Sequence, residues 1–285
     1  MTVALSSCFS GSARPSVMAV VNVTPDSFSD GGRLFSKNEP SVDLVVETAL
    51  QMIADGADII DIGGESTRPG AQKVSLTQEL ERVIPVVYAL RKHSDIPISV
   101  DTSRPEVILE AAKAGANLLN DVRALRVNGA LEAFLKTDMS VCLMHMQGEP
   151  ESMQDDPFYD DVVEDVLRFL LDRAAVCKAA GVSQNRILID PGFGFGKTLA
   201  HNLLLLQQLG RFDESGYPVL VGLSRKSMLA ALTGRQVEDR LAGSLALALE
   251  AVNRGASIVR VHDVKATVDA LKVHQAVKMA GKRHE

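Results

Sequence analysis

Polar or ionisable side chains close each of eight short apolar runs in this sequence. They are Asn22, Asp61, Asp101, Asn120, His145, Asp190, the group Ser224, Arg225 and Lys226, and the pair Arg260 and His262. A single aspartate after an apolar run is commonly a helix N-cap. Capping does not explain the whole set, because Asn22, His145, Arg260 and His262 have no evident helix start behind them. The pattern predicts a binding site assembled from the ends of separate segments.

Four of these residues have the chemistry of a site for a flat, polar heterocycle. Asp101, Asn120 and Asp190 are short side chains that accept hydrogen bonds, and Lys226 is a donor. A ring with several N–H groups and a carbonyl would satisfy each of them in a closed pocket. A second interpretation stays open here. Asp101 and Asp190 would equally be satisfied by buried ion pairs with Lys226, which leave no charge unpaired.

A second group has the chemistry of a diphosphate site. Arg68, Arg260 and His262 are cationic or can become so, and arginine binds phosphate oxygens in a two-pronged geometry. Asn22 offers an amide oxygen to a hard cation, and a magnesium ion on phosphates needs only one or two protein ligands. His145 and His262 lack a second ligand at suitable spacing, which disfavours a histidine metal site.

The elements that must position these residues alternate along the chain. Strand-like runs occupy residues 17–22, 57–63, 97–102, 117–122, 140–145, 186–191, 218–223 and 257–262. Helical periodicity separates them, most clearly over 159–180, and Gly56, Gly115 and Gly255 suit left-handed helix C-caps. Eight such repeats predict a single (β/α)8 TIM barrel with its active site at the C-terminal ends of the strands. An open doubly wound sheet is the alternative on alternation alone.

Length and composition limit the class of protein. The chain has 285 residues, 46% of them hydrophobic, which suits one barrel over 15–280 with a flexible segment at 1–14 and a tail at 281–285. A net charge of −6 without a basic run argues against nucleic-acid binding. No apolar run approaches the roughly 18 residues of a membrane span, and no signal peptide is expected. Three cysteines without CxxC spacing predict reduced thiols in the cytoplasm.

The glycine-rich run from Gly192 to Lys197 invites a nucleotide-binding interpretation that its spacing does not support. A P-loop needs a glycine where Pro191 stands, and G-x-G-x-G is not the dinucleotide spacing. We interpret the glycines as allowing tight backbone turns beside a ligand. Cys142 lies within an apolar run and is expected in the core, while Met144 would cover the face of a flat ring.

Six segments at the run ends resemble the dihydropteroate synthase family, in the same order along the chain. They are residues 22–32 (NVTPDSFSDGG), 61–70 (DIGGESTRPG), 144–148 (MHMQG), 190–197 (DPGFGFGK), 224–227 (SRKS) and 260–263 (RVHD). The resemblance covers almost the whole chain apart from residues 1–14. It implies an enzyme that joins p-aminobenzoate to a pterin diphosphate, in a form without the additional pterin enzymes fused to some relatives.

The resemblance implies a role for each site residue. The implied pterin contacts are Asp101, Asn120, Met144, Asp190, Phe195, Gly222, Lys226 and Arg260. The implied diphosphate contacts are Asn22, Thr67, Arg68, Arg260 and His262, with Mg²⁺ on Asn22. The implied contacts to p-aminobenzoate, whose site sulfonamides occupy in this family, are Phe28, Thr67, Pro69, Ser224 and Lys226. The residues implied to act in catalysis are Asp101, Lys226, Arg68 and Arg260. The implied partners are small-molecule substrates and a second copy of the chain.

We hypothesise a dissociative substitution. Diphosphate leaves the pterin methylene carbon, the cation is delocalised into the ring beside Asp101, and the aniline nitrogen then attacks. The polar segments 24–38 and 64–75 are expected to close over the site and exclude water. Two alternatives remain: a pterin-binding methyltransferase of similar shape, and a catalytically silent pterin-binding barrel.

Overall fold

Eight parallel strands form a barrel in the computed structural model, which describes residues 14–24, 35–36, 39–65, 74–148, 153 and 156–280. The strands are β1 (Ser16–Asn22), β4 (Ile59–Gly63), β5 (Ile98–Asp101), β6 (Leu118–Asp121), β7 (Ser140–Met144), β8 (Ile187–Asp190), β9 (Leu220–Val221) and β10 (Ile258–Val261). Their order is β8-β7-β6-β5-β4-β1-β10-β9. Each of the eight predicted runs contains one strand, so the predicted strands are confirmed.

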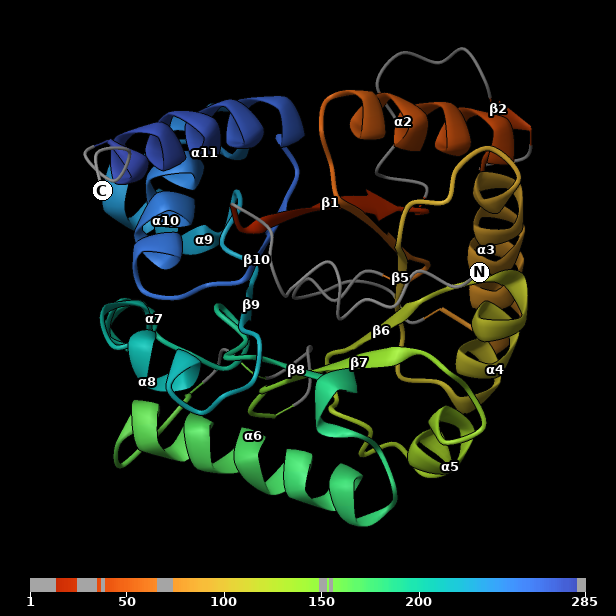
Figure 1. The fold of residues 1–285 in the computed structure, drawn as a ribbon, viewed down its shortest axis with the longest axis horizontal. Coiled ribbons are helices and arrows are strands. Elements are labelled where there is room, and N and C mark those ends of the chain that lie inside the picture. Colours follow the sequence, from red (N-terminus) through yellow and green to blue (C-terminus); the bar gives the residue numbers. More distant parts are fainter. Residues whose placement is uncertain are drawn as a thin grey trace.

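The sheet closes on itself between its first and last strands. Ile189 in β8 pairs in parallel with Val219, which directly precedes β9. The Ile189 N–H donates to the carbonyl of Pro218 over 3.0 Å. A doubly wound sheet would leave two free edges, so this contact decides for the (β/α)8 barrel and against the open alternative. Figure 1 shows the strands in the middle and the helices around them.

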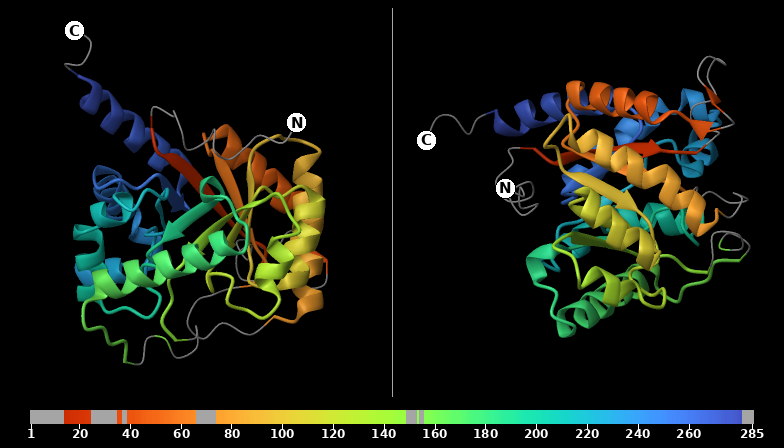
Figure 2. Two further views of the ribbon diagram at one scale, coloured as in Figure 1. Left: turned by 60° about the horizontal axis from the view of Figure 1, so that its bottom comes forward. Right: turned by 90° about the vertical axis from the view of Figure 1, so that its right-hand side faces the viewer.

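The helices run between the strands and cover the outside of the barrel. They are α2 (Val42–Ala54), α3 (Leu76–Arg91), α4 (Pro105–Ala114), α5 (Ala130–Phe134), α6 (Val162–Ala179), α7 (Leu199–Gln207), α8 (Gly210–Asp213), α9 (Ser227–Thr233), α10 (Leu241–Asn253) and α11 (Val264–Met279), with 3₁₀ turns η2 (Gln184–Arg186) and η3 (Val237–Asp239). Figure 2 shows α11 extending beyond the barrel toward the C-terminus. None of the helices in the described part of the chain has the length and apolarity needed to span a bilayer.

Local sequence signals set the helix ends. Gly56, Gly115 and Gly255 have φ values of 101°, 105° and 97°, which confirms the predicted left-handed turns behind α2, α4 and α10. Ser75 begins α3 with a capping box. The predicted loop 24–38 is wrong in one detail. Phe35–Ser36 (β2) pairs antiparallel with Glu39–Pro40 (β3), strands too short to produce a period-two pattern.

In α6 and α10 the buried residues differ from those that the helical spacing of apolar residues predicts. Val163, Val166 and Leu170 of α6 are buried as expected, but Leu171 is 37% exposed. The apolar spacing in α10 predicts a buried stripe of Leu241, Leu245, Leu249 and Val252. Leu241 is instead 39% exposed, and the buried residues are Ser244, Leu247, Ala248, Ala251 and Val252. Val252 of the stripe is buried and Leu249 packs against the core, so only the start of the stripe is exposed.

Side chains inside the barrel alternate with side chains that pack under the helices. One buried cluster is formed by Met18, Ile59, Leu118, Cys142, Leu188, Leu220 and Ile258. Successive side chains of a strand point to opposite faces, so the residue two positions further along faces inward again. Those next inward positions include Asp61, Asn120, Asp190 and Arg260, nearer the C-terminal ends. The interior therefore changes from an apolar floor to a polar mouth.

Candidate active site

Arg260 joins two carboxylates across the mouth of the barrel. Its Nε donates to Asp61 Oδ2 over 2.7 Å, and one terminal nitrogen donates to Asp101 Oδ2 over 3.1 Å. Asn120 Nδ2 lies 3.3 Å from the same Asp61 oxygen. The four side chains come from β10, β4, β5 and β6 and form one connected group, here called the strand-end cluster. The predicted convergence of Asp101, Asn120 and Arg260 is confirmed.

Two acceptors of the strand-end cluster are buried without a hydrogen bond from any described residue. They are the second carboxylate oxygen of Asp61 and the side-chain oxygen of Asn120. Asp61 is fully buried and Asn120 is 4% exposed. Buried acceptors are nearly always satisfied in folded proteins, so these two atoms fit a ligand that brings its own N–H donors.

Asp190 and Lys226 form the neighbouring wall. Asp190 Oδ1 accepts the Gly192 N–H over 2.7 Å. Lys226 Nζ donates to the carbonyl of Phe193 and lies 4.7 Å from the centroid of the Phe195 ring. The ion pairs of Asp101 are with Arg260, and no described ion pair joins Lys226 to Asp101 or Asp190. The alternative in which Lys226 forms those salt bridges is therefore wrong.

An apolar surface adjoins this wall. Met144 belongs to a small buried cluster with Val122, Met146 and Met153, and Phe195 packs against it. Gly222 lies at an inward position of the barrel, and a Cβ there would lie 4.0 Å from the Cβ of Arg260. A flat ring would therefore meet apolar groups on its face and the polar cluster at its edge.

Burial and charge shift the pKa values of these groups. Burial raises the pKa of Asp101 to about 7, although Arg260 opposes the shift. Burial also raises the pKa of Asp190 against the Gly192 amide and Lys226. Burial lowers the pKa of Lys226 to about 8, with Asp190 opposing. For Arg260, burial alone would lower the pKa, but Asp61 and Asp101 raise it overall. Asp101 thus changes its charge close to neutral pH.

A second group of polar residues lies at the ends of β9 and β10. Ser224 Oγ accepts the backbone N–H of His262 over 3.2 Å and lies 3.0 Å from its Nδ1. Arg225, at a φ of 57°, donates twice to Asp263, over 2.9 and 2.6 Å. This bidentate ion pair joins the residues that directly follow Ser224 and His262 and so holds the two strand ends together. Ser224 and His262, which the sequence assigned to different substrates, are therefore in direct contact.

Asn22 lies beside Asp101 with a glycine between them. Asn22, Gly63 and Asp101 are partners in register across β1, β4 and β5. A Cβ on Gly63 would lie 3.5 Å from Asn22 Oδ1 and 3.5 Å from the Cβ of Asp101. The glycine leaves the amide oxygen of Asn22 uncovered toward the mouth. A single oxygen donor of this kind fits a magnesium ion whose other ligands are phosphate oxygens and water.

Four predicted site residues lie outside the described residues: Phe28, Thr67, Arg68 and Pro69. The chain on either side of residues 66–73 is held by one arginine. Arg104 donates to the carbonyl of Val74 and forms ion pairs with Glu65 at 3.6 Å and with Glu79 at 2.9 Å. Glu79 is 1% exposed and accepts the Thr102 hydroxyl over 2.5 Å. Arg104, held by the buried Glu79, thus binds Glu65 and Val74, which lie on the two sides of the segment that carries Arg68.

Asp61 is among the run-end residues of the sequence but received no specific role there, whereas the structure places it at the centre of the strand-end cluster. Its signal was present, because a carboxylate surrounded by isoleucines in a strand can be buried only with a partner. The partner, Arg260, is 199 residues away in the chain. Nothing local identifies such a pair.

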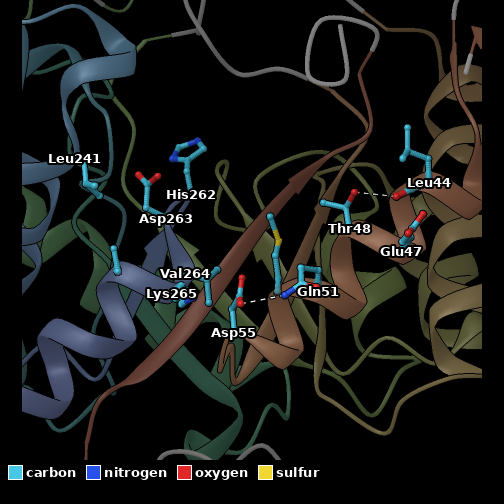
Figure 3. Close-up of a pocket in the computed structure, with 12 residues that line it drawn as sticks. Leu44, Glu47, Thr48, Gln51, Asp55, Leu241, His262, Asp263, Val264 and Lys265 are labelled. Carbon is cyan, nitrogen blue, oxygen red and sulfur yellow. Dashed lines mark hydrogen bonds between the residues drawn. The ribbon is translucent and has the colours of Figure 1, made fainter. Parts of the chain in front are cut away.

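A groove of about 670 Å³ lies beside the strand-end cluster, between α2 and the start of α11. Figure 3 shows Glu47 and Thr48 of α2 on one side, His262 with Asp263 on the other, and Asp55, which follows α2, beside Val264 and Lys265. Of the predicted site residues, the groove shares only His262. Carboxylates on both sides make it unsuitable for a diphosphate, so we place the substrates at the strand ends.

The barrel and its polar mouth define the class of the protein. Residues 18–262 match the family model described as pterin binding enzyme. A barrel that holds buried carboxylates, an amide and an arginine at its strand ends has the hydrogen-bond donors and acceptors that a pterin ring requires.

Known relatives specify the family further. The chain is 52% identical over 275 residues to dihydropteroate synthase of Escherichia coli K12, covering 96% of both chains. It is 52% identical over 266 residues to that of Haemophilus influenzae, covering 93% of this chain and 95% of the relative. The chain belongs to the dihydropteroate synthase family. The methyltransferase and silent-barrel alternatives are therefore set aside.

Solved structures agree with this assignment. Yersinia pestis dihydropteroate synthase in a sulfonamide complex superposes with a TM-score of 0.88 at 51% identity, covering 94% of this chain and 96% of that chain. The Xanthomonas albilineans enzyme in complex with 7,8-dihydropteroate gives a TM-score of 0.83 at 49% identity, covering 93% and 94%.

Proposed function

We propose that the strand-end cluster binds the pterin ring in the dihydropteroate synthase reaction. The enzyme condenses 6-hydroxymethyl-7,8-dihydropterin diphosphate with p-aminobenzoate, giving 7,8-dihydropteroate and diphosphate in folate biosynthesis. The observation that carries the assignment is the pair of buried, unpartnered acceptors on Asp61 and Asn120. They suit the N–H groups along one edge of a pterin. Asp190 offers a further acceptor at the strand ends, and Met144 and Phe195 offer apolar groups to the face of the ring.

The same residues would stabilise charge as the reaction proceeds. When the bond to diphosphate breaks, the methylene carbon becomes electron-deficient and the positive charge spreads into the pterin. Asp101 lies in the cluster where that charge develops, and its ionised form would stabilise it. Arg260 holds Asp101 and Asp61 in place through two of its nitrogens. The aniline nitrogen of p-aminobenzoate then forms the new bond and loses a proton.

Asn22 and His262 would contact the diphosphate, with Thr67, Arg68 and Arg260. The third guanidinium nitrogen of Arg260 makes no hydrogen bond to the described residues and suits this role. Mg²⁺ on Asn22 would neutralise the leaving group when bound. We expect Asn22→Ala to raise the Mg²⁺ concentration needed for half-maximal turnover while pterin affinity stays unchanged. A titration of turnover against Mg²⁺ measures this, and an unchanged midpoint would remove Asn22 as a ligand.

Ser224 and Lys226 would border p-aminobenzoate, together with Phe28, Thr67 and Pro69. Ser224 is fixed by His262 and Lys226 by the carbonyl of Phe193, so both side chains are held at the mouth. We therefore expect the second substrate to lie between the pterin wall and the diphosphate side. We propose that sulfonamides compete at this position.

Release of pyrophosphate on mixing the two substrates tests the reaction itself. A methyltransferase or a silent barrel would bind the pterin without releasing pyrophosphate. Asp190→Asn tests the pterin site, because the amide replaces an acceptor with a donor beside the Gly192 N–H. We expect the Kd for a pterin analogue, measured by calorimetry, to rise about 10-fold or more. An unchanged Kd would show that the pterin binds elsewhere.

We further propose that the enzyme works in the cytoplasm as a homodimer. Cys142 and Cys177 are free and buried, which agrees with a reducing compartment. Light scattering of the purified chain measures the assembly directly, and a monomer mass at micromolar concentration would overturn the dimer.

A further inference from the structure

A buried lysine lies behind the proposed pterin site and has no role in the reaction described above. Lys197 is 3% exposed. Its Nζ lies 2.9 Å from the carbonyl of Gly192, 3.0 Å from the carbonyl of Phe195 and 2.9 Å from Nδ1 of His145. The carbonyl of His145 is at 3.4 Å. Burial lowers the pKa of Lys197, with Asp190 opposing the shift, and the three acceptors at short distance match the three N–H groups of its protonated form.

The two carbonyls belong to a glycine-rich segment that has one backbone hydrogen bond of its own, from the Phe195 N–H to the Gly192 carbonyl over 3.1 Å. Gly192, Gly194 and Gly196 have φ values of 68°, 80° and 63°, in the left-handed region that favours glycine. A Cβ on Gly192 would lie 1.9 Å from the carbonyl oxygen of His145. Glycine permits this close approach but also gives the unfolded segment great conformational freedom. Contacts from outside the segment therefore help to fix its conformation; one is the side chain of Asn202, whose Oδ1 accepts the Gly194 N–H over 2.7 Å, and another is Lys197.

The other side of the same segment carries the proposed pterin contacts. The Gly192 N–H binds the carboxylate of Asp190, and the Phe193 carbonyl binds Lys226. The Phe195 ring lies 4.7 Å from Lys226 Nζ. Lys197 thus binds the carbonyls of two residues that bear directly on the pterin wall. A shift of this segment would displace Asp190, Lys226 and Phe195 together.

His145, which directly follows β7, supplies the third acceptor for Lys197. Its ring packs edge-on against Phe169 at 5.0 Å between centroids, and it also meets Tyr159 at 6.0 Å. Burial, with Lys197 nearby, lowers the pKa of His145 to about 2, so the imidazole is neutral. A neutral ring with its proton on Nε2 leaves the Nδ1 lone pair for the lysine.

We propose that Lys197, oriented by His145, is a positioning residue that fixes the segment from Gly192 to Phe195 so that the pterin wall is formed before substrate arrives. This inference rests on the proposed pterin site. Lys197 does not touch the substrate. It acts through backbone carbonyls, so its loss would weaken pterin recognition more than recognition of p-aminobenzoate.

Lys197→Met tests the inference, because it keeps the aliphatic stem and removes all three donors. We expect the KM for the pterin diphosphate, and the Kd for a pterin analogue, to rise about 10-fold to 100-fold. The KM for p-aminobenzoate should stay within about twofold. His145→Phe keeps the ring packing but removes one acceptor of three, so a smaller change in the same direction is expected.

Arg91→Met is the matched control. Arg91 also binds backbone carbonyls, those of Ser94, Ile96 and Gly115, but at the N-terminal ends of β5 and β6. It should lose thermal stability without a change in either KM. The positioning role is overturned if Lys197→Met keeps the wild-type pterin KM, or if Arg91→Met raises it equally.

Amide hydrogen exchange separates this inference from the proposed function. The amides of residues 192–196 should exchange faster in Lys197→Met than in the wild type, whatever the ligand is. If wild-type enzyme fails to bind a pterin but the exchange still increases, the pterin site is wrong and the structural role of Lys197 stands. If exchange is unchanged, the lysine does not fix the segment.

Discussion

Removal of Arg260 should destabilise the fold in a pH-dependent way. Arg260→Met leaves Asp61, which is fully buried, without its cation at 2.7 Å. It also removes the ion pair to Asp101 at 3.1 Å. Removing one partner of a buried pair typically costs about 3–5 kcal/mol, because the remaining charge is uncompensated. We expect a loss of this size in the free energy of unfolding near pH 8.5.

The loss should be smaller at lower pH. Burial already raises the pKa of Asp101 to about 7 in the presence of Arg260, so its removal must raise that pKa further. The folded variant then binds an additional proton relative to the unfolded chain, and its stability falls as pH rises. One such proton changes the free energy of unfolding by about 1.4 kcal/mol per pH unit. Because wild-type Asp101 holds this proton up to about pH 7, the two proteins respond alike near about pH 6.5 and diverge above pH 7, by about 2 kcal/mol at about pH 8.5.

Urea denaturation at both pH values measures the effect. Arg186→Met is the control, because Arg186 binds the carbonyls of Thr137 and Met139 and forms no described ion pair. Its cost should not depend on pH in this range. The double variant Arg260→Met with Asp61→Asn should lose less than the sum of the single changes. Equal losses at both pH values, or additive single changes, would refute the assignment of Arg260 as the counterion of Asp61 and Asp101.

Three other predictions concern Gly192 and Asp101. Gly192→Ala should cost more stability in urea than Gly216→Ala; Gly216 has a similar φ of 79° but nothing within 4 Å of its Cβ position, so equal costs would argue against the close contact with His145. Pterin affinity should change with a midpoint near pH 7, where Asp101 gains or loses its proton, and the change should vanish in Asp101→Asn; calorimetry across the range checks this. Because that pKa is raised above the unfolded value, the stability contribution of Asp101 falls as pH rises from about 4 to about 7, and Asp101→Asn should remove that slope.

The strands and their inward residues could be predicted from the sequence because they depend on local patterns. Each strand is a short apolar run, and side chains alternate with a period of two. Asp101, Asn120, Asp190 and Arg260 could therefore be predicted to face one rim once eight strands were counted. Helix ends depend equally on local sequence, because glycine is the residue favoured at a left-handed C-cap, as at Gly115.

The partners within the site could not be predicted in this way. Asp61 meets Asn120 across 59 residues of chain and Arg260 across 199, and Lys197 meets His145 across 52. Several cations and several carboxylates were available at the rim, and the sequence left open an ion pair of Asp101 with Lys226, whereas the fold pairs Asp101 with Arg260. The sequence by itself determined which residues lie at the mouth, because periodicity is a local property. Only the tertiary structure decided which charges meet, because closure and stagger of the barrel set their distances.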